Sequence, residues 1–151
     1  MNIHLKSNFI ISLLTCFLVI ESTFYASAQG RDVSITIHLR GVYESKISLL
    51  SMSGSRTFKP IREVQGIKNG EITKIQVPTD NLPGELVLRF DYKETEESTP
   101  YPSEKSIFAY DQDLELWVSP KYCNNSDSTW FQEGERENAT FLRFSKENGK
   151  K

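Results

Sequence analysis

The residues of this sequence that could do chemistry are few and scattered. Beyond residue 30 the chain has one histidine, His38, and one cysteine, Cys123. A histidine-based zinc site or a nucleophile with a histidine base needs partners that the sequence does not supply. We therefore expect His38 to be a surface residue and Cys123 to be a packed or exposed thiol, with no internal disulfide.

Two groups of acidic residues have the types found in metal or catalytic sites. Asp111-x-Asp113-x-Glu115 offers oxygen ligands, but it lacks the glycine and the twelfth-position glutamate of a calcium loop. The second group is four glutamates around Pro100-Tyr101-Pro102: Glu94, Glu96, Glu97 and Glu104. Paired carboxylates near an aromatic ring are typical of glycoside hydrolases, yet this polar segment would not bury a carboxyl group. We predict no catalytic residue, no metal site and no cofactor.

Three aromatic residues are the candidate interaction residues: Trp117, Trp130 and Tyr101. Trp117 falls on the polar face of its predicted strand, so it is either half exposed or covered by the chain that follows. Indole and phenol rings could stack on sugar rings, but the sequence leaves open whether the three share a face. Asn124-Asn125-Ser126 and Asn138-Ala139-Thr140 match the N-glycosylation pattern, which matters only in a eukaryotic secretory host.

The overall charge argues against one class of partner. The chain has a formal net charge of −2, and its lysines and arginines are dispersed. Nucleic-acid binders usually carry a basic patch or a markedly basic domain. We therefore predict no nucleic acid, and a protein or another component of the cell envelope as the partner.

The first residues have the pattern of an export signal. Lys6 precedes an apolar run over residues 9–20, and Ala26-Ser27-Ala28 matches the site after which a signal peptidase cuts. The run is shorter than the roughly 20 residues that span a bilayer. The sequence thus predicts a secretory signal peptide over residues 1–28, no permanent membrane span after cleavage, and a periplasmic, envelope-associated or secreted protein.

Alternating apolar and polar residues then predict a β domain. The clearest run is 86–92, where Leu86, Leu88, Phe90 and Tyr92 share one face. Further strands are expected at residues 33–40, 46–52, 57–64, 72–77, 105–110 and 113–119. Pro60 cannot donate to a strand ladder and places 57–64 at an edge. We expect the 86–92 strand to be central.

The connections complete the predicted architecture. Asn69-Gly70 and Asp111-Gln112 have the length and type of tight hairpin turns, and residues 93–103 read as a solvated loop. A helix is predicted over residues 133–148. The fold class is mainly β: an antiparallel β-sandwich of about seven short strands over residues 29–120. A polar loop and C-terminal helix over 121–151 follow, or begin a further domain.

The order of these parts resembles a known bacterial family. The segments that carry the resemblance are Ile47-Ser48-Leu49-Leu50, Lys59-Pro60-Ile61, Ile67-Lys68-Asn69-Gly70-Glu71 and Leu82-Pro83-Gly84-Glu85. Over residues 31–119 the chain resembles the N-terminal β-sandwich domain of unknown function found in envelope proteins of Bacteroidota-type bacteria. That domain often precedes a thioredoxin-like domain, but no C-x-x-C pair follows here, so the resemblance assigns redox activity to no residue.

These observations predict an exported, non-enzymatic β-sandwich that acts as an accessory or interaction module of the bacterial envelope. One alternative is the truncated N-terminal part of a thioredoxin-like thiol-disulfide protein whose catalytic domain is missing. Another is a carbohydrate-binding sandwich that uses Trp117, Trp130 and Tyr101 as stacking platforms.

Overall fold

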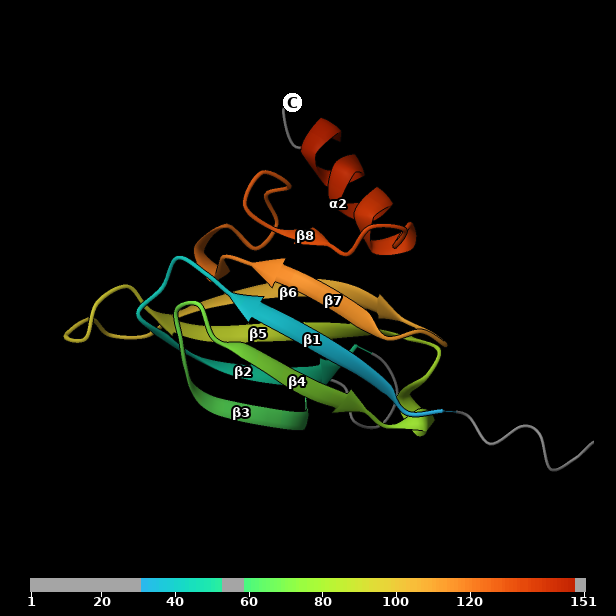
Figure 1. Cartoon of the computed structure of the whole chain (residues 1–151), viewed down its shortest axis with the longest axis horizontal. Helices are drawn as coiled ribbons and strands as arrows, with labels where there is room; N and C mark the ends of the chain where they lie inside the picture. The colour runs from blue at the N-terminus through green and yellow to red at the C-terminus, as the bar shows by residue number, and fades with distance from the viewer. Residues whose placement is uncertain (1–30, 53–58, 149–151) are drawn as a thin grey trace, which may run out of the picture. The chain divides into compact units, whose positions relative to one another are not determined.

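The computed structural model describes residues 31–52 and 59–148, and residues Arg31–Lys151 form one compact unit. Two four-stranded sheets pack face to face, and the α-helix α2 lies at one end (Figure 1). The predicted fold class, a mainly β sandwich with a C-terminal helix, is confirmed. The predicted signal peptide and the first two residues of the 57–64 strand lie outside the described residues.

The first sheet, sheet A, has the strand order β4-β1-β7-β8. Its strands are β1 (Val33–Leu39), β4 (Ile72–Val77), β7 (Leu114–Val118) and β8 (Trp130–Phe131). β1 pairs antiparallel with β4 but parallel with β7, so the sandwich is not wholly antiparallel as predicted. β8 was not predicted, because two residues are too few to show an alternating pattern.

The second sheet, sheet B, is antiparallel throughout and has the order β3-β2-β5-β6. Its strands are β2 (Glu44–Ser51), β3 (Pro60–Lys68), β5 (Gly84–Lys93) and β6 (Tyr101–Ala109). The predicted central strand is confirmed, since β5 lies between β2 and β6, and β3 lies at an edge as Pro60 indicated. β6 begins inside the segment predicted as a loop, so that loop is limited to residues 94–100.

The core fills the space between the two sheets and follows the predicted period of two. The inward row of β5 is fully or almost fully buried: Leu86, Leu88, Phe90 and Tyr92. Facing it are the inward rows of β1 and β7: Val33, Ile35, Ile37, Leu39, Leu114, Leu116 and Val118. Each of these side chains contributes roughly 1.5–3 kcal/mol on burial.

Both predicted hairpin turns connect different sheets. Asn69-Gly70 joins β3 of sheet B to β4 of sheet A, and Asp111-Gln112 joins β6 to β7 in the same way. Gly70 adopts φ +82°, as the turn type requires. The Asn69 side chain also accepts a hydrogen bond from the Gly41 N–H at 2.8 Å. The turns are therefore in the predicted places, but the hairpin pairing is wrong.

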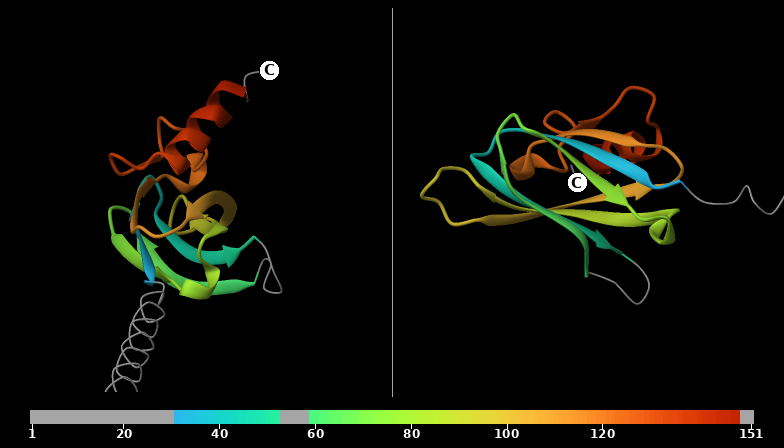
Figure 2. Two further views of the ribbon diagram at one scale, coloured as in Figure 1. Left: turned by 90° about the vertical axis from the view of Figure 1, so that its right-hand side faces the viewer. Right: turned by 60° about the horizontal axis from the view of Figure 1, so that its bottom comes forward.

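The C-terminal segment closes one end of the sandwich. The short helix η3 (Pro120–Tyr122) leads to β8, and α2 (Glu137–Asn148) follows. α2 begins four residues later than predicted, after Gly134, whose φ of +89° is incompatible with a right-handed helix. Figure 2 shows α2 projecting from the sandwich beyond β8. In the described part of the chain, no helix is long and apolar enough to cross a membrane.

Candidate functional site

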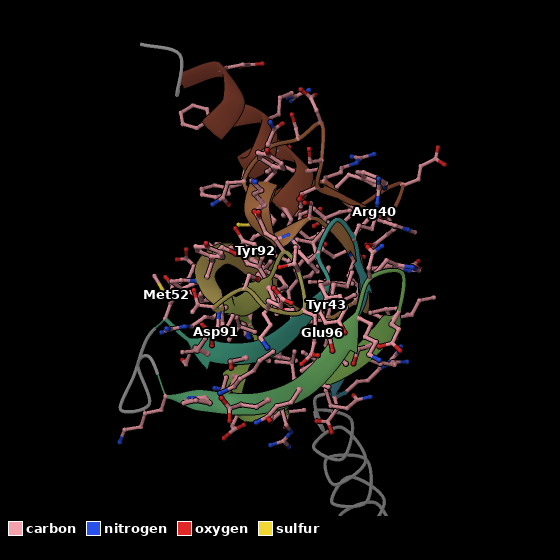
Figure 3. All side chains as sticks on the ribbon, turned by 90° about the vertical axis from the view of Figure 1, so that its left-hand side faces the viewer. Arg40, Tyr43, Met52, Asp91, Tyr92 and Glu96 are labelled. Carbon is pink, nitrogen blue, oxygen red and sulfur yellow. The ribbon has the colours of Figure 1, made fainter. Side chains whose placement is uncertain are left out.

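Two of the three candidate aromatic residues meet on the outer face of sheet A. The strand register places His38, Trp117 and Trp130 in one line across β1, β7 and β8. The imidazole stacks on the Trp117 indole at 4.4 Å between ring centroids, and the two indoles are parallel at 6.1 Å. Arg40, labelled in Figure 3, follows the end of β1 and places its guanidinium 4.6 Å from the Trp130 ring centre. We call these four residues the aromatic row.

Each residue of the aromatic row contacts another residue of the row or a neighbouring side chain. Nε2 of His38 lies 2.7 Å from a carboxylate oxygen of Glu115, so the imidazole has both a stacking and a polar partner. Trp117 stacks against both His38 and Trp130, and Arg40 covers Trp130. A sugar ring stacks on an open ring face, and the contacts within the row compete for these faces. The row is better explained as cross-strand stabilisation of sheet A.

Tyr101 lies apart from the aromatic row. It opens β6 in sheet B, opposite Tyr92, with their ring centroids 6.0 Å apart. Tyr92 is labelled in Figure 3, and its side chain belongs to the core row of β5. The structure therefore brings Trp117 and Trp130 together but does not add Tyr101 to their surface.

Asp113, which precedes β7, and Glu115, which lies on β7, have separate partners. Asp113 accepts the Ser34 N–H at 2.8 Å and pairs with Arg31 at 2.7 Å, while Glu115 contacts His38. The Ser34 hydrogen bond, with help from Arg31, lowers the pKa of Asp113 below its usual value. Within residues 31–52 and 59–148, no three His, Cys, Asp or Glu side chains gather in a group that could hold a metal ion.

The glutamates of the second acidic group are exposed and do not converge. Glu94 pairs with Lys121 at 2.7 Å, and Glu96, Glu97 and Glu104 lie on the surface. A general acid in glycoside hydrolysis needs a carboxyl group whose pKa is raised by burial. The described geometry does not provide that environment at any of the four.

Cys123 and Lys105 form a buried pair that the sequence did not reveal. Cys123 is 4% exposed and its thiol donates to the Glu104 carbonyl at 3.3 Å. Burial raises the pKa of this thiol, which makes it a poor nucleophile. Lys105 is 1% exposed, and its ammonium lies 5.5 Å from the Phe131 ring centre. Burial lowers the pKa of Lys105 to about 8, and the nearby Cys123 opposes this shift.

α2 is attached to β6 by a buried side-chain amide. Asn138 accepts the Phe108 N–H at 2.7 Å and donates to the Phe108 carbonyl at 2.9 Å, so it occupies the free edge of β6. The buried Glu135 carboxylate accepts the N–H groups of Asn138 and Ala139 at the start of α2. Asn138 is 4% exposed, so its glycosylation pattern is inaccessible in the folded chain.

Next to this attachment lies an exposed apolar surface. Phe108 of β6 is 52% exposed, and Phe141 and Phe144 of α2 are 54% and 62% exposed. They line a shallow depression of about 560 Å³ together with Arg136, Glu137 and Thr140. We call it the α2–β6 groove. Beside the groove, the Tyr110 hydroxyl donates a hydrogen bond to the Glu137 carboxylate at 2.9 Å. The pKa of Tyr110 is raised to about 12, mainly by burial and secondly by this carboxylate.

Sequence reasoning missed the groove for identifiable reasons. The sequence predicts a helix that contains Phe141 and Phe144, but the surface also depends on Phe108 from a distant strand and on Asn138, whose sequence context indicates only a glycosylation pattern. The burial of Lys105 could have been predicted from the sequence. Lys105 lies on the same face of its strand as the buried Ile107 and Ala109, because alternate residues of a strand share a face.

The comparisons with known proteins identify no family, relative or structural neighbour for this chain. The chain matches no protein-family model, no curated protein and no solved structure. The resemblance to the envelope β-sandwich domain therefore stays a prediction.

Proposed function

We propose that this protein is an exported, non-catalytic β-sandwich that serves as an accessory or interaction module of the bacterial cell envelope, and that its contact surface is the α2–β6 groove. The observation that carries the proposal is the exposure of Phe108, Phe141 and Phe144 on one surface. Contiguous exposed apolar surface on a soluble domain is typical of interaction sites.

The supports of the groove favour binding over accidental exposure. Asn138 and Glu135 hold the start of α2 on the edge of β6 through hydrogen bonds of 2.7–3.1 Å. A surface held rigidly before binding loses less conformational entropy when a partner docks. Aromatic side chains are also the residues that most often dominate the energy of an interface.

Export is the second part of the proposal and rests on the sequence. The apolar run over 9–20 and Ala26-Ser27-Ala28 are the features that support it. Mass spectrometry of the protein isolated from the native cell tests this directly. We expect an N-terminus at Gln29 in the envelope or periplasmic fraction, and an uncleaved protein in the cytosolic fraction would contradict it.

The interaction surface can be tested by photo-crosslinking in the native cell. A photoreactive phenylalanine derivative replaces Phe141 in one variant and Ile72 in the other. Ile72, on β4 of sheet A, is 62% exposed and is the matched control, since it is an apolar residue at least as exposed as Phe141 and lies outside the groove. We expect a discrete crosslinked product from position 141 and none from position 72. No product from position 141 would contradict the proposed surface.

Carbohydrate binding is the second candidate, favoured only by the shared face of Trp117 and Trp130. It requires a ligand to displace Arg40 from the Trp130 ring, where the guanidinium now lies 4.6 Å from the ring centre. Arg40→Ala should then strengthen retention on immobilised glycans, because it uncovers the ring. An absence of retention for both the wild type and this variant would end this alternative.

A further inference from the structure

We infer that the α2–β6 groove is occupied by a second copy of this chain, which forms a twofold-symmetric dimer. This inference rests on the proposed function, because it names the partner of the same surface. In a twofold interface the same patch serves both subunits, so the patch must be complementary to itself in shape and in charge. The groove meets both conditions.

The charges that line the groove are self-complementary. Among the described residues that line the groove, the charged ones are one cation and one anion: Arg136, directly before α2, and Glu137, the first residue of α2. Arg136 makes no ion pair with any carboxylate of the described residues, and Glu137 uses one oxygen to accept the Tyr110 hydroxyl. A twofold axis through the groove would bring each Arg136 to the partner's Glu137. A partner whose surface carries only one sign of charge would place a like charge against either Arg136 or Glu137.

The shape of the surface also suits a second copy. Phe141 and Phe144 lie one helical turn apart on α2, and both line the groove beside Phe108. The exposed phenylalanines and the depression that they line therefore belong to one surface, so each copy can place its phenylalanines against the depression of the other. α2 projects from the sandwich, as Figures 1 and 2 show, so that two helices can approach while the sheets stay apart. Antiparallel crossing of the helices would also oppose their dipoles favourably.

The test is a charge-reversal cycle measured by sedimentation equilibrium. The protein is expressed from its full reading frame and purified in the form that the cell accumulates. We expect the wild type to dimerise with a dissociation constant on the order of 1–100 µM, as small interfaces do. Arg136→Glu and Glu137→Arg should each raise this constant about tenfold, because each places like charges together across the axis. The double reversal should restore it to within about threefold of the wild type.

The restoration distinguishes pairing between copies from a general loss of structure. A double variant that associates no better than the single variants would overturn the inference, as would a wild type that stays monomeric at about 1 mM. Phe141→Ser, which leaves both charges in place, should weaken the dimer at least tenfold through the loss of an aromatic anchor.

The crosslinking experiment separates this inference from the proposed function. A product from position 141 with twice the mass of the chain supports both. A product with a different protein, combined with a monomeric wild type, overturns the dimer and keeps the interaction surface. No product together with a monomeric wild type overturns both.

Discussion

Two clusters of aromatic side chains lie on the surface of this domain, and they differ in how their rings are used. In the aromatic row, Trp117 and Trp130 stack on each other and on His38 and Arg40. In the α2–β6 groove, three phenylalanines stay more than half exposed. The first cluster completes a sheet, whereas the second presents apolar surface to the solvent.

The comparison shows that residue type alone is a poor guide to a binding surface. The sequence indicates Trp117, Trp130 and Tyr101 as candidates because indole and phenol rings can stack on sugar rings. The rings of Trp117 and Trp130 nevertheless stack against neighbouring groups, although Trp130 is still 38% exposed. The phenylalanines of the groove match no binding motif in the sequence, yet the buried Asn138 and Glu135 hold the helix that carries Phe141 and Phe144 against β6. What distinguishes the groove is its exposed area: Phe108, Phe141 and Phe144 are 52–62% exposed, whereas Trp130 is 38% exposed and Trp117 is only partly exposed.

The largest expected effect comes from removing the support of the groove. Asn138→Ala takes away both hydrogen bonds to the Phe108 backbone and leaves the Glu135 carboxylate with fewer donors. Each buried polar group left without a partner costs about 1–3 kcal/mol. We expect the free energy of unfolding to fall by about 3 kcal/mol, measured by urea denaturation.

The control for this variant is Asn124→Ala. Asn124 is exposed and donates one hydrogen bond to the Glu104 carbonyl, also on β6, so its loss should cost less than about 1 kcal/mol. Equal losses for the two variants would show that α2 is not held by the buried amide.

The aromatic row should show the next largest effect. Trp117→Ala removes the ring that stacks against both His38 and Trp130, so both neighbours lose a partner. We expect a loss of about 2–3 kcal/mol in the free energy of unfolding, below the full cost of a buried aromatic residue because Trp117 is only partly buried. Trp117→Phe keeps a stacking ring and should recover at least half of it. An Ala variant as stable as the wild type would mean that the row is not structural.

Much of the sandwich could be predicted because strand alternation determines which side chains face inward. The alternating run of 86–92 placed Leu88 and Phe90 in the core, and both are fully buried. Pro60 identified an edge strand, since a residue without an N–H cannot serve inside a ladder. These inferences are local, and their physical causes lie within a few residues of one another.

The pairing of strands could not be predicted in the same way. Asn69-Gly70 has the backbone preference of a hairpin turn, but β4 pairs with β1 and leaves β3 in the other sheet. The turn fixes only the reversal of the chain. Which strand then becomes the neighbour depends on how the apolar faces of both sheets are covered, which is a property of the whole core.

The site escaped prediction because its parts are distant in sequence. The groove joins Phe108 to residues of α2 about 30 positions later, through the side chain of Asn138. Lys105 could have been placed inward by its parity with Ile107. The residues that surround Lys105 could not be predicted, because Phe131 and Cys123 come from the distant C-terminal segment.

Lys105 lies outside both clusters, where β6 is close to Phe131 and Cys123 of the C-terminal segment. Its burial predicts how the stability of the protein depends on pH. Its ammonium is disfavoured inside the folded chain, so it loses its proton near pH 8, while the unfolded chain holds it up to the ordinary pKa of 10.5. Between these values the unfolded state binds more protons, and the free energy of unfolding therefore rises with pH. Below pH 8 the penalty is fully present.

The measurement compares the wild type with Lys105→Met at several pH values. The variant should be the more stable protein at pH 7.5, and its advantage should shrink by roughly 2 kcal/mol between pH 7.5 and pH 9.5. The other titrating groups are shared by the two proteins and cancel in the difference, except for Cys123, whose pKa Lys105 lowers in the wild type alone. A constant difference across this range would show that Lys105 stays hydrated in the folded state.

The smallest effect on stability is expected where the groove is most exposed. Phe144→Ser replaces a side chain that is 62% exposed, so the free energy of unfolding should change by less than about 0.5 kcal/mol. The same change should abolish most of the crosslinking from position 141 if the groove is an interaction surface, because an aromatic anchor of an interface acts only when a partner covers it. A variant that loses stability as Trp117→Ala does, with crosslinking unchanged, would place Phe144 in the same class as the aromatic row. Retained stability with lost crosslinking is what separates a surface built for a partner from one built for the fold.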